Sequence, residues 1–172
     1  MVGNLLRGFV DGALSTLGIV IGATSAAPAV IIAAAVGGTV ANGIANALSA
    51  FSSESASRHA ELREIEKALV DRDLRGTALD RNVQVAIAKA SVVDGLGTIA
   101  GGVIPVLPYV FMPVSRALPT SAGVVIIAIS IVGLYLGRVS RRNLALSALK
   151  MAVSGIAVAG IVYLIQSLIT PQ

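Results

Sequence analysis

Five apolar segments, each long enough to cross a bilayer, constrain most strongly what this chain can fold into. They lie at residues 8–25, 27–51, 90–113, 119–137 and 145–169. A helix needs about 20 mostly apolar residues to cross the hydrocarbon core. Composition agrees, because only 13% of the residues are charged, against about a quarter in a soluble domain. The sequence therefore predicts an all-α integral membrane protein with five transmembrane helices.

One long polar segment, residues 52–89, separates the second and third apolar segments. Its composition favours helix, and Gly76-Thr77 predicts a turn between two helices that stand off the membrane. We therefore expect three parts. Residues 1–51 hold transmembrane helices one and two, residues 52–89 form a cytoplasmic helical segment, and residues 90–172 hold transmembrane helices three to five.

Basic residues in the connections predict the orientation of the chain. Arg7, the seven Lys and Arg residues of the polar segment, and the arginines of 138–142 fall on one side, against Arg116 on the other. Since cytoplasmic loops are enriched in Lys and Arg, we expect a cytoplasmic N-terminus and an external C-terminus. No cleavable signal is evident. The net charge of +4 requires no nucleic-acid partner, and the lack of cysteine excludes disulfides and thiolate metal sites.

The first apolar segment contains a single carboxylate, Asp11, about one turn inside its predicted start. An acidic group at such a depth is costly and by default marks an ion pathway or has a fixed partner. Ser15 follows on the same face, and small residues at four positions predict close contact with another helix. These helix-packing residues are Gly8, Gly12, Gly18 and Gly22. The alternative is a packing helix whose aspartate is neutralised by a nearby lysine.

The second apolar segment carries a polar stripe at helical spacing. Its members are Thr39, Asn42, Asn46, Ser49 and Ser53. Amides in hydrocarbon need partners, so this face meets another helix or water. Interhelical hydrogen bonding and the lining of a pore both remain open.

Two more charged residues fall inside apolar segments. Asp94-Gly95 of the third segment resembles Asp11-Gly12 and indicates a weak internal repeat, as is common in transporters. Lys150 lies about two turns into the fifth segment. It either snorkels to the cytoplasmic surface or pairs with Asp94 or Asp11. Downstream of Asp94, two prolines in the third segment predict a kink or a broken helix.

Acidic residues recur along the polar segment. Glu54, Glu61 and Glu64 share one helical face with Arg58 between them, and the chain's one histidine is His59. Clustered carboxylates suit divalent cations, so these residues are candidate metal ligands. The alternative is a solvated helix laced with i, i+4 ion pairs.

Three segments resemble the vacuolar iron transporter family. They are Asp11-Gly-Ala-Leu-Ser-Thr-Leu-Gly, Gly43-Ile-Ala-Asn-Ala-Leu-Ser-Ala-Phe-Ser-Ser-Glu54 and Gly101-Gly-Val-Ile-Pro-Val-Leu-Pro-Tyr109. The resemblance implies five spans, a cytoplasmic helical insert, and dimers that export ferrous iron, and often manganese, from the cytosol in exchange for protons. It places the pathway between subunits and matches Asp11 to the first-span aspartate of that pathway.

The sequence departs from that family at pathway positions. Gly38 and Asn46 stand where the family has a glutamate and a methionine, and Ala50 stands where it has a further glutamate. The insert is short and contains no methionine. Loss of a thioether removes a ligand that softer metals prefer. Asp94 is a candidate for the missing carboxylate.

Together with these patterns, the resemblance implies a divalent cation transporter, with Fe²⁺ or Mn²⁺ as substrate and no tightly bound cofactor. We expect proton-coupled export by a homodimer in a prokaryotic cell membrane, with lipid, metal ions and protons as its partners. The alternative is a non-transporting membrane scaffold or regulatory protein with the same fold, and motifs of intramembrane enzymes are absent from the sequence. The expected pathway residues are Asp11, Ser15, Asn42, Asn46, Asp94 and Lys150, and the expected metal ligands are Asp11, Glu54, Glu61 and Glu64.

Overall fold

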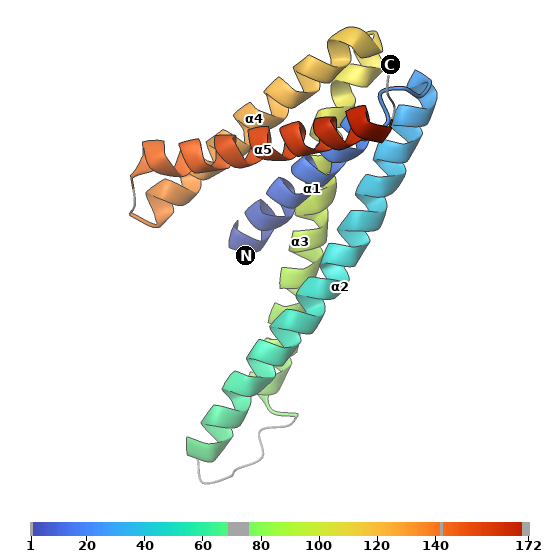
Figure 1. Ribbon diagram of the computed structural model, residues 1–172. Coiled ribbons are helices and arrows are strands. Elements are labelled where there is room, and N and C mark those ends of the chain that lie inside the picture. The colour runs from blue at the N-terminus through green and yellow to red at the C-terminus, as the bar shows by residue number, and fades with distance from the viewer. Residues whose placement is uncertain (1, 69–75, 142, 170–172) are drawn as a thin grey trace.

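The computed structural model describes residues 2–68, 76–141 and 143–169. Within these ranges the chain forms helices and no strands (Figure 1). The helices are α1 (Val2–Gly22), α2 (Pro28–Ala68), α3 (Ala78–Phe111), α4 (Val114–Val139) and α5 (Leu144–Ile169). All five are long and apolar enough to cross a membrane. The predicted all-α fold with five transmembrane helices is therefore confirmed.

The described parts of the polar segment, residues 52–68 and 76–89, continue the helices of the neighbouring spans instead of forming helices of their own. α2 continues without a break past residue 51 to Ala68, and α3 begins at Ala78, twelve residues before the predicted start of the third span. The C-terminal end of α2 and the N-terminal end of α3 extend beyond the N-terminus of α1 (Figure 1). Hydropathy shows where the apolar surface of a helix ends. The backbone hydrogen bonds of the same helix continue through the polar residues beyond that point. The expected turn is present, since Gly76 has a φ of 73° and Thr77 caps α3.

Glycines allow α1 and α3 to pack backbone against backbone as parallel helices. A Cβ atom added to Gly8 or Gly12 would overlap the backbone of Asp94 or Thr98. The relation is reciprocal, because a Cβ atom on Gly97 or Gly101 of α3 would overlap the backbone of α1. Such close approach between membrane helices requires small residues.

The other two predicted packing glycines lie elsewhere on α1. Gly18 faces α5, where an added Cβ atom would lie 3.7 Å from Val162. An added Cβ atom on Gly22 would meet nothing within 4 Å. Only Gly8 and Gly12 therefore belong to the seam between α1 and α3.

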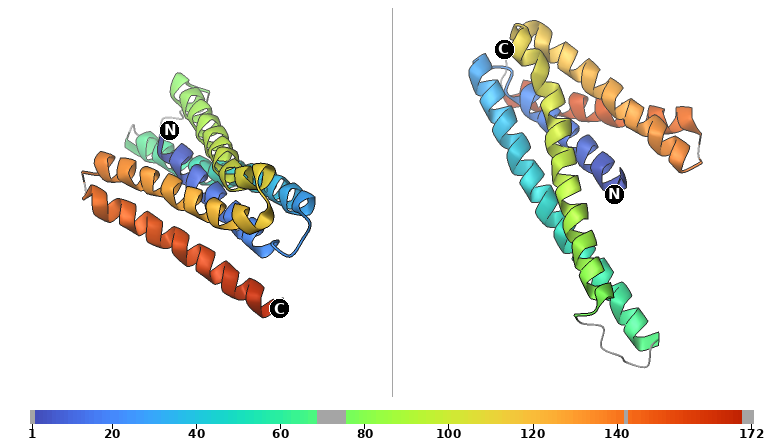
Figure 2. Two further views of the ribbon diagram at one scale, coloured as in Figure 1. Left: turned by 90° about the horizontal axis from the view of Figure 1, so that it is seen from above. Right: turned by 180° about the vertical axis from the view of Figure 1, so that it is seen from behind.

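A hydrophobic core forms where α1 passes between the upper parts of α2, α3 and α4. Its buried members are Ala13, Leu17, Val20, Ile21, Ile31, Ala35, Val106, Tyr109, Ala117, Val125 and Ile129. α5 packs on α4 and α1 at the outside of the bundle (Figure 2). Gly155 is the one buried residue among those described in α5, so most of this helix is available to lipid.

α3 passes through Pro105 and Pro108 as one continuous helix. Neither proline can donate a backbone hydrogen bond. The Pro105 carbonyl accepts a bond of 2.7 Å from the buried hydroxyl of Ser121 on α4. The helix is therefore not broken at these prolines, and a neighbouring helix binds to it there.

Candidate functional site

Asp11 lies near the middle of α1. The sequence predicted a position about one turn inside the helix, but α1 begins at Val2, so Asp11 is nine residues, or about 14 Å, from the helix start. Asn4 and Arg7 look like residues preceding a span, but both lie within the helix. The helix therefore starts earlier than expected, and the depth of Asp11 in the bilayer stays a prediction.

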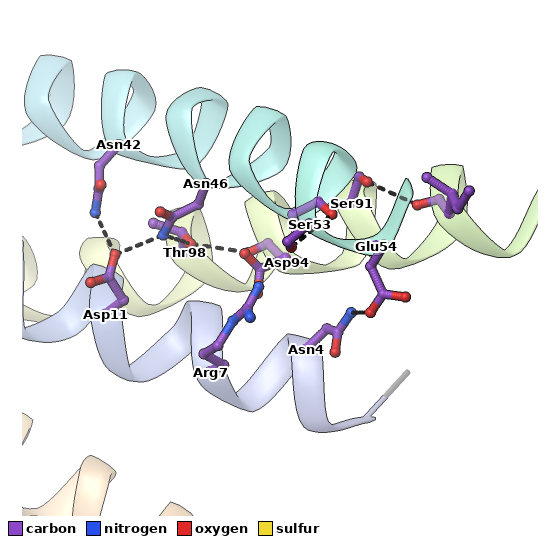
Figure 3. A network of polar contacts seen from close by, with 12 residues as sticks. Asn4, Arg7, Asp11, Asn42, Asn46, Ser53, Glu54, Ser91, Asp94 and Thr98 are labelled. Atoms are coloured by element: carbon purple, nitrogen blue, oxygen red, sulfur yellow. Dashed lines mark hydrogen bonds and ion pairs between the residues drawn. The ribbon is translucent and has the colours of Figure 1, made fainter. Parts of the chain in front are cut away.

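Two amides of α2 hold the Asp11 carboxylate. Asn42 Nδ2 donates to Asp11 Oδ2 at 2.9 Å, and Asn46 Nδ2 donates to the same oxygen at 2.7 Å (Figure 3). The asparagines are four residues apart and so lie on one face of α2. No lysine or arginine among the described residues pairs with Asp11. The predicted alternative of a lysine-neutralised aspartate is thus not what this part of the chain forms.

Two hydroxyl groups fix how these amides are turned. Ser15 Oγ donates to the Asp11 backbone carbonyl at 2.7 Å and accepts from Asn42 Nδ2 at 2.9 Å. Thr98 Oγ1 donates to the Asp94 backbone carbonyl at 3.0 Å and accepts from Asn46 Nδ2 at 2.9 Å. A hydroxyl has one proton, so each hydroxyl that donates to a carbonyl presents only lone pairs to its amide.

Asp11 is nevertheless exposed on the surface of the single chain, while Asn42 and Asn46 are half-buried. At the middle of a membrane helix, an exposed carboxylate is costly unless it meets water or another protein surface. The polar stripe on α2 likewise has a buried end and an exposed end. Thr39 is buried and bonds to Thr16 at 2.7 Å, so interhelical bonding closes that end of the stripe.

The remaining stripe residues, Ser49 and Ser53, are exposed. Ser53 Oγ donates only to a carbonyl of its own helix, that of Ala50, at 3.3 Å. Interhelical bonding is therefore present at Thr39, Asn42 and Asn46, whereas a pore lined by this stripe stays a prediction.

Asp94 has a different ion partner from the one considered in the sequence. Its side chain is 3% exposed, and Asp94 Oδ1 lies 3.1 Å from both Nε and Nη2 of Arg7. Lys150 is exposed on α5, which packs on α4 and α1. The proposed pairing of Lys150 with Asp94 or Asp11 was wrong for the described residues. Arg7 was overlooked because it seemed to precede the membrane helix.

The predicted acidic ligands of α2 lie around an arginine. Arg58 Nε is 3.3 Å from Glu54 Oε2, and Arg58 Nη1 is 3.8 Å from Glu61 Oε2. Glu64 is exposed, and His59 bonds to Ser55 of its own helix. No three acidic or histidine side chains converge on one point in the described ranges. The contacts match the expected ion-paired, solvated helix, and metal capture by these residues stays a prediction.

Glu54 also lines a pocket of about 480 Å³ at the junction of α1, α2 and α3. The lining residues are Asn4, Glu54, Arg58, Asn82, Val85, Ala86, Lys89 and Ala90. Asn4 Nδ2 donates to Glu54 Oε1 at 3.5 Å. From this pocket, polar side chains of α1 and α3 continue past Arg7 and Asp94 to Asp11 (Figure 3).

Asn4, Arg7 and Thr98 were missing from the predicted site. Asn4 and Arg7 stand seven and four residues before Asp11, which places all three on one helical face. Extending the first helix toward its N-terminus would have revealed the two residues. Thr98 stands four residues after Asp94, so the same spacing rule would have placed it beside that carboxylate.

Comparison with known proteins identifies a matching family and a relative. The sequence model of the VIT family matches residues 68–167. An uncharacterized protein of Methanocaldococcus jannaschii is 36% identical over 165 residues, which cover 94% of this chain and 86% of that protein. The family match covers α3 to α5, whereas Asp11, Asn42 and Asn46 fall in the part that only the archaeal relative spans.

Proposed function

This chain belongs to the VIT family, metal-ion transporters of the vacuolar iron transporter kind, and we propose that it carries divalent cations across the membrane through a site at Asp11. The proposal depends on one observation. Asp11 lies near the middle of α1, accepts hydrogen bonds from two amides, forms no ion pair with any described residue and is open to the surface of the chain. A divalent cation supplies the charge that this arrangement lacks.

A second copy of the chain is the partner best suited to shield the exposed Asp11 carboxylate from lipid. A surface carboxylate facing lipid is costly, whereas two copies related by a two-fold axis place the same surface patch on both sides of their interface. Two Asp11 side chains would then share one site. This arrangement offsets the loss of the pathway glutamate at Gly38, where the tip of Ile19 fills the space that a side chain would need.

Asp94 is a weaker candidate for the missing carboxylate, because Arg7 already neutralises it. The Glu54 pocket is the proposed entrance, on the side to which the arginine-rich connections assign the cytoplasm. We further propose that the substrate is Fe²⁺ or Mn²⁺ and that protons move in the opposite direction. A proton and a metal ion compete for the same carboxylate, which couples release of one to binding of the other.

Uptake of Mn²⁺ and Fe²⁺ into proteoliposomes under a proton gradient tests the function. Asp11→Asn preserves side-chain size and removes the charge, so we expect at least about a tenfold loss of uptake. Glu66→Gln makes the same kind of change at a carboxylate of α2 that is not among the predicted metal ligands, so it serves as the matched control. Undiminished uptake by a correctly folded Asp11→Asn protein refutes the role of Asp11.

A second candidate function is that of a non-transporting scaffold or regulatory protein. The observations that favour it are the filled space at Gly38 and the ion pairs that Arg58 makes with Glu54 and Glu61. This function predicts neither metal-dependent flux nor metal binding by the full chain. Calorimetry that finds micromolar, Asp11-dependent binding contradicts it.

A further inference from the structure

The groups around Asp11 offer a metal ion only oxygen. The side chains that bond to the carboxylate or orient its partners are Ser15, Asn42, Asn46 and Thr98. An amide nitrogen donates hydrogen bonds, so a cation uses the amide oxygen instead. The available ligand atoms are therefore carboxylate, amide and hydroxyl oxygens.

Softer ligands lie elsewhere in the described part of the chain. The chain contains no cysteine. Met112 caps the C-terminus of α3. It stands fourteen residues beyond Thr98, or about 20 Å along the helix. Met151 packs against Gly133 of α4, and His59 is thirteen residues beyond Asn46, on the projecting part of α2.

Resting on the function proposed above, we propose that the Asp11 site selects hard, oxygen-seeking divalent cations such as Mn²⁺ over thiophilic cations such as Cd²⁺. Carboxylate and carbonyl oxygens suit Mg²⁺, Ca²⁺ and Mn²⁺, whereas thioether and thiolate ligands select softer metals. Cd²⁺ is the informative competitor, because a sulfur ligand strengthens its binding far more than that of Mn²⁺. The substrate of this chain is thus Mn²⁺-like.

The hydroxyl groups make the amides suitable ligands. In the structure, the amide nitrogens point at Asp11 Oδ2. Binding a cation requires each amide to turn so that its oxygen replaces its nitrogen. Ser15 Oγ and Thr98 Oγ1 then release their backbone carbonyls and donate to the amide oxygens, since a hydroxyl both donates and accepts. Ser15 and Thr98 act here as positioning residues.

Mn²⁺ binding to the full-length protein, measured by electron paramagnetic resonance and displaced by Cd²⁺, tests this selectivity. We expect Mn²⁺ to bind the wild-type protein, Asp11→Asn to lose that binding, and Cd²⁺ to displace Mn²⁺ only at about threefold or greater excess. Asn46→Met should shift the preference toward Cd²⁺ by about tenfold or more. Val40→Met places the same thioether on an exposed position of α2 off the polar stripe and should change nothing.

Two results overturn the selectivity. One is displacement of Mn²⁺ from the wild-type protein by less than about a threefold excess of Cd²⁺. The other is the absence of Mn²⁺ binding that depends on Asp11. Failure of transport is recognised separately, because a protein that binds Mn²⁺ with this selectivity but moves no cation into vesicles refutes the proposed function and leaves the selectivity standing.

Discussion

Arg7 of α1 and Asp94 of α3 form an ion pair in which Asp94 Oδ1 lies 3.1 Å from the guanidinium nitrogens. The aspartate is buried, whereas the arginine side chain is 61% exposed. The pair lies one helical turn before Asp11, on the seam where glycines bring α1 and α3 together. Arg7 thus neutralises Asp94. Asp11, on the same helix as Arg7, forms no ion pair with any described residue.

Breaking this pair from the arginine side should destabilise the protein. Arg7→Met leaves a buried carboxylate unpaired, and we expect a loss of about 1–3 kcal/mol in unfolding free energy, less than for a fully buried pair because Arg7 reaches solvent. The double variant Arg7→Met, Asp94→Asn should recover most of this loss. Denaturant or thermal unfolding of detergent-solubilised protein measures both.

An exposed arginine of α2 provides the control for that cycle. Arg63→Met should change the stability by less than about 0.5 kcal/mol. If the loss in Arg7→Met persists unchanged in the double variant, the pair does not couple the two helices and Arg7 acts through packing alone.

The seam between α1 and α3 predicts a sharp contrast between two glycines of the same helix. A Cβ atom on Gly12 would meet the backbone of Thr98, which cannot move without separating the helices. We expect Gly12→Ala to lower the thermal midpoint by many degrees or to prevent folding. Gly3→Ala adds a Cβ atom with nothing within 4 Å, so it should be neutral or slightly stabilising. Equal midpoints for the two variants would contradict the close contact.

Removing the arginine at the proposed entrance should favour metal capture. Arg58 lies between Glu54 and Glu61 and acts as a tethered cation that competes with metal ions for both carboxylates. We expect Arg58→Gln to lower the half-saturating Mn²⁺ concentration by about two- to fivefold at low salt, with a smaller effect at high salt. Stability should change by less than about 0.5 kcal/mol, because exposed ion pairs contribute little.

Arg63→Gln removes a positive charge from the same helix. Among the described residues, Arg63 forms no ion pair with Glu54 or Glu61. It therefore separates a local effect from a change in net charge. Identical shifts in the two variants would show that Arg58 acts only through the overall field.

Hydropathy predicted the number of spans because the bilayer sets a minimum apolar length that is visible residue by residue. It did not predict where the helices end, since hydrogen bonding continues through polar residues. The same limit explains why the start of the first helix was placed too late and why Arg7 was overlooked, since the helix starts at Val2.

Periodicity predicted which residues share a face, and it grouped Asn42 with Asn46 correctly. It carried no information about which helix face lies opposite. For this reason Lys150 looked suitable as a partner for Asp94, and Arg7 of α1 was overlooked. Partner choice depends on how α5 packs outside the bundle, which no local pattern records.

The bond between Ser121 and Pro105 should matter more than other serine bonds of α4. Ser121 is fully buried, and its hydroxyl joins α4 to α3 beside the proline-containing turn. Ser121→Ala removes an interhelical bond, so we expect a loss of about 0.5–1 kcal/mol in unfolding free energy. Ser130 Oγ donates to Ile126 of its own helix at 2.6 Å, so Ser130→Ala removes no link between helices and should be near neutral. Unfolding of both variants in the same detergent decides the point, and equal stabilities would show that α4 is held against α3 by packing alone.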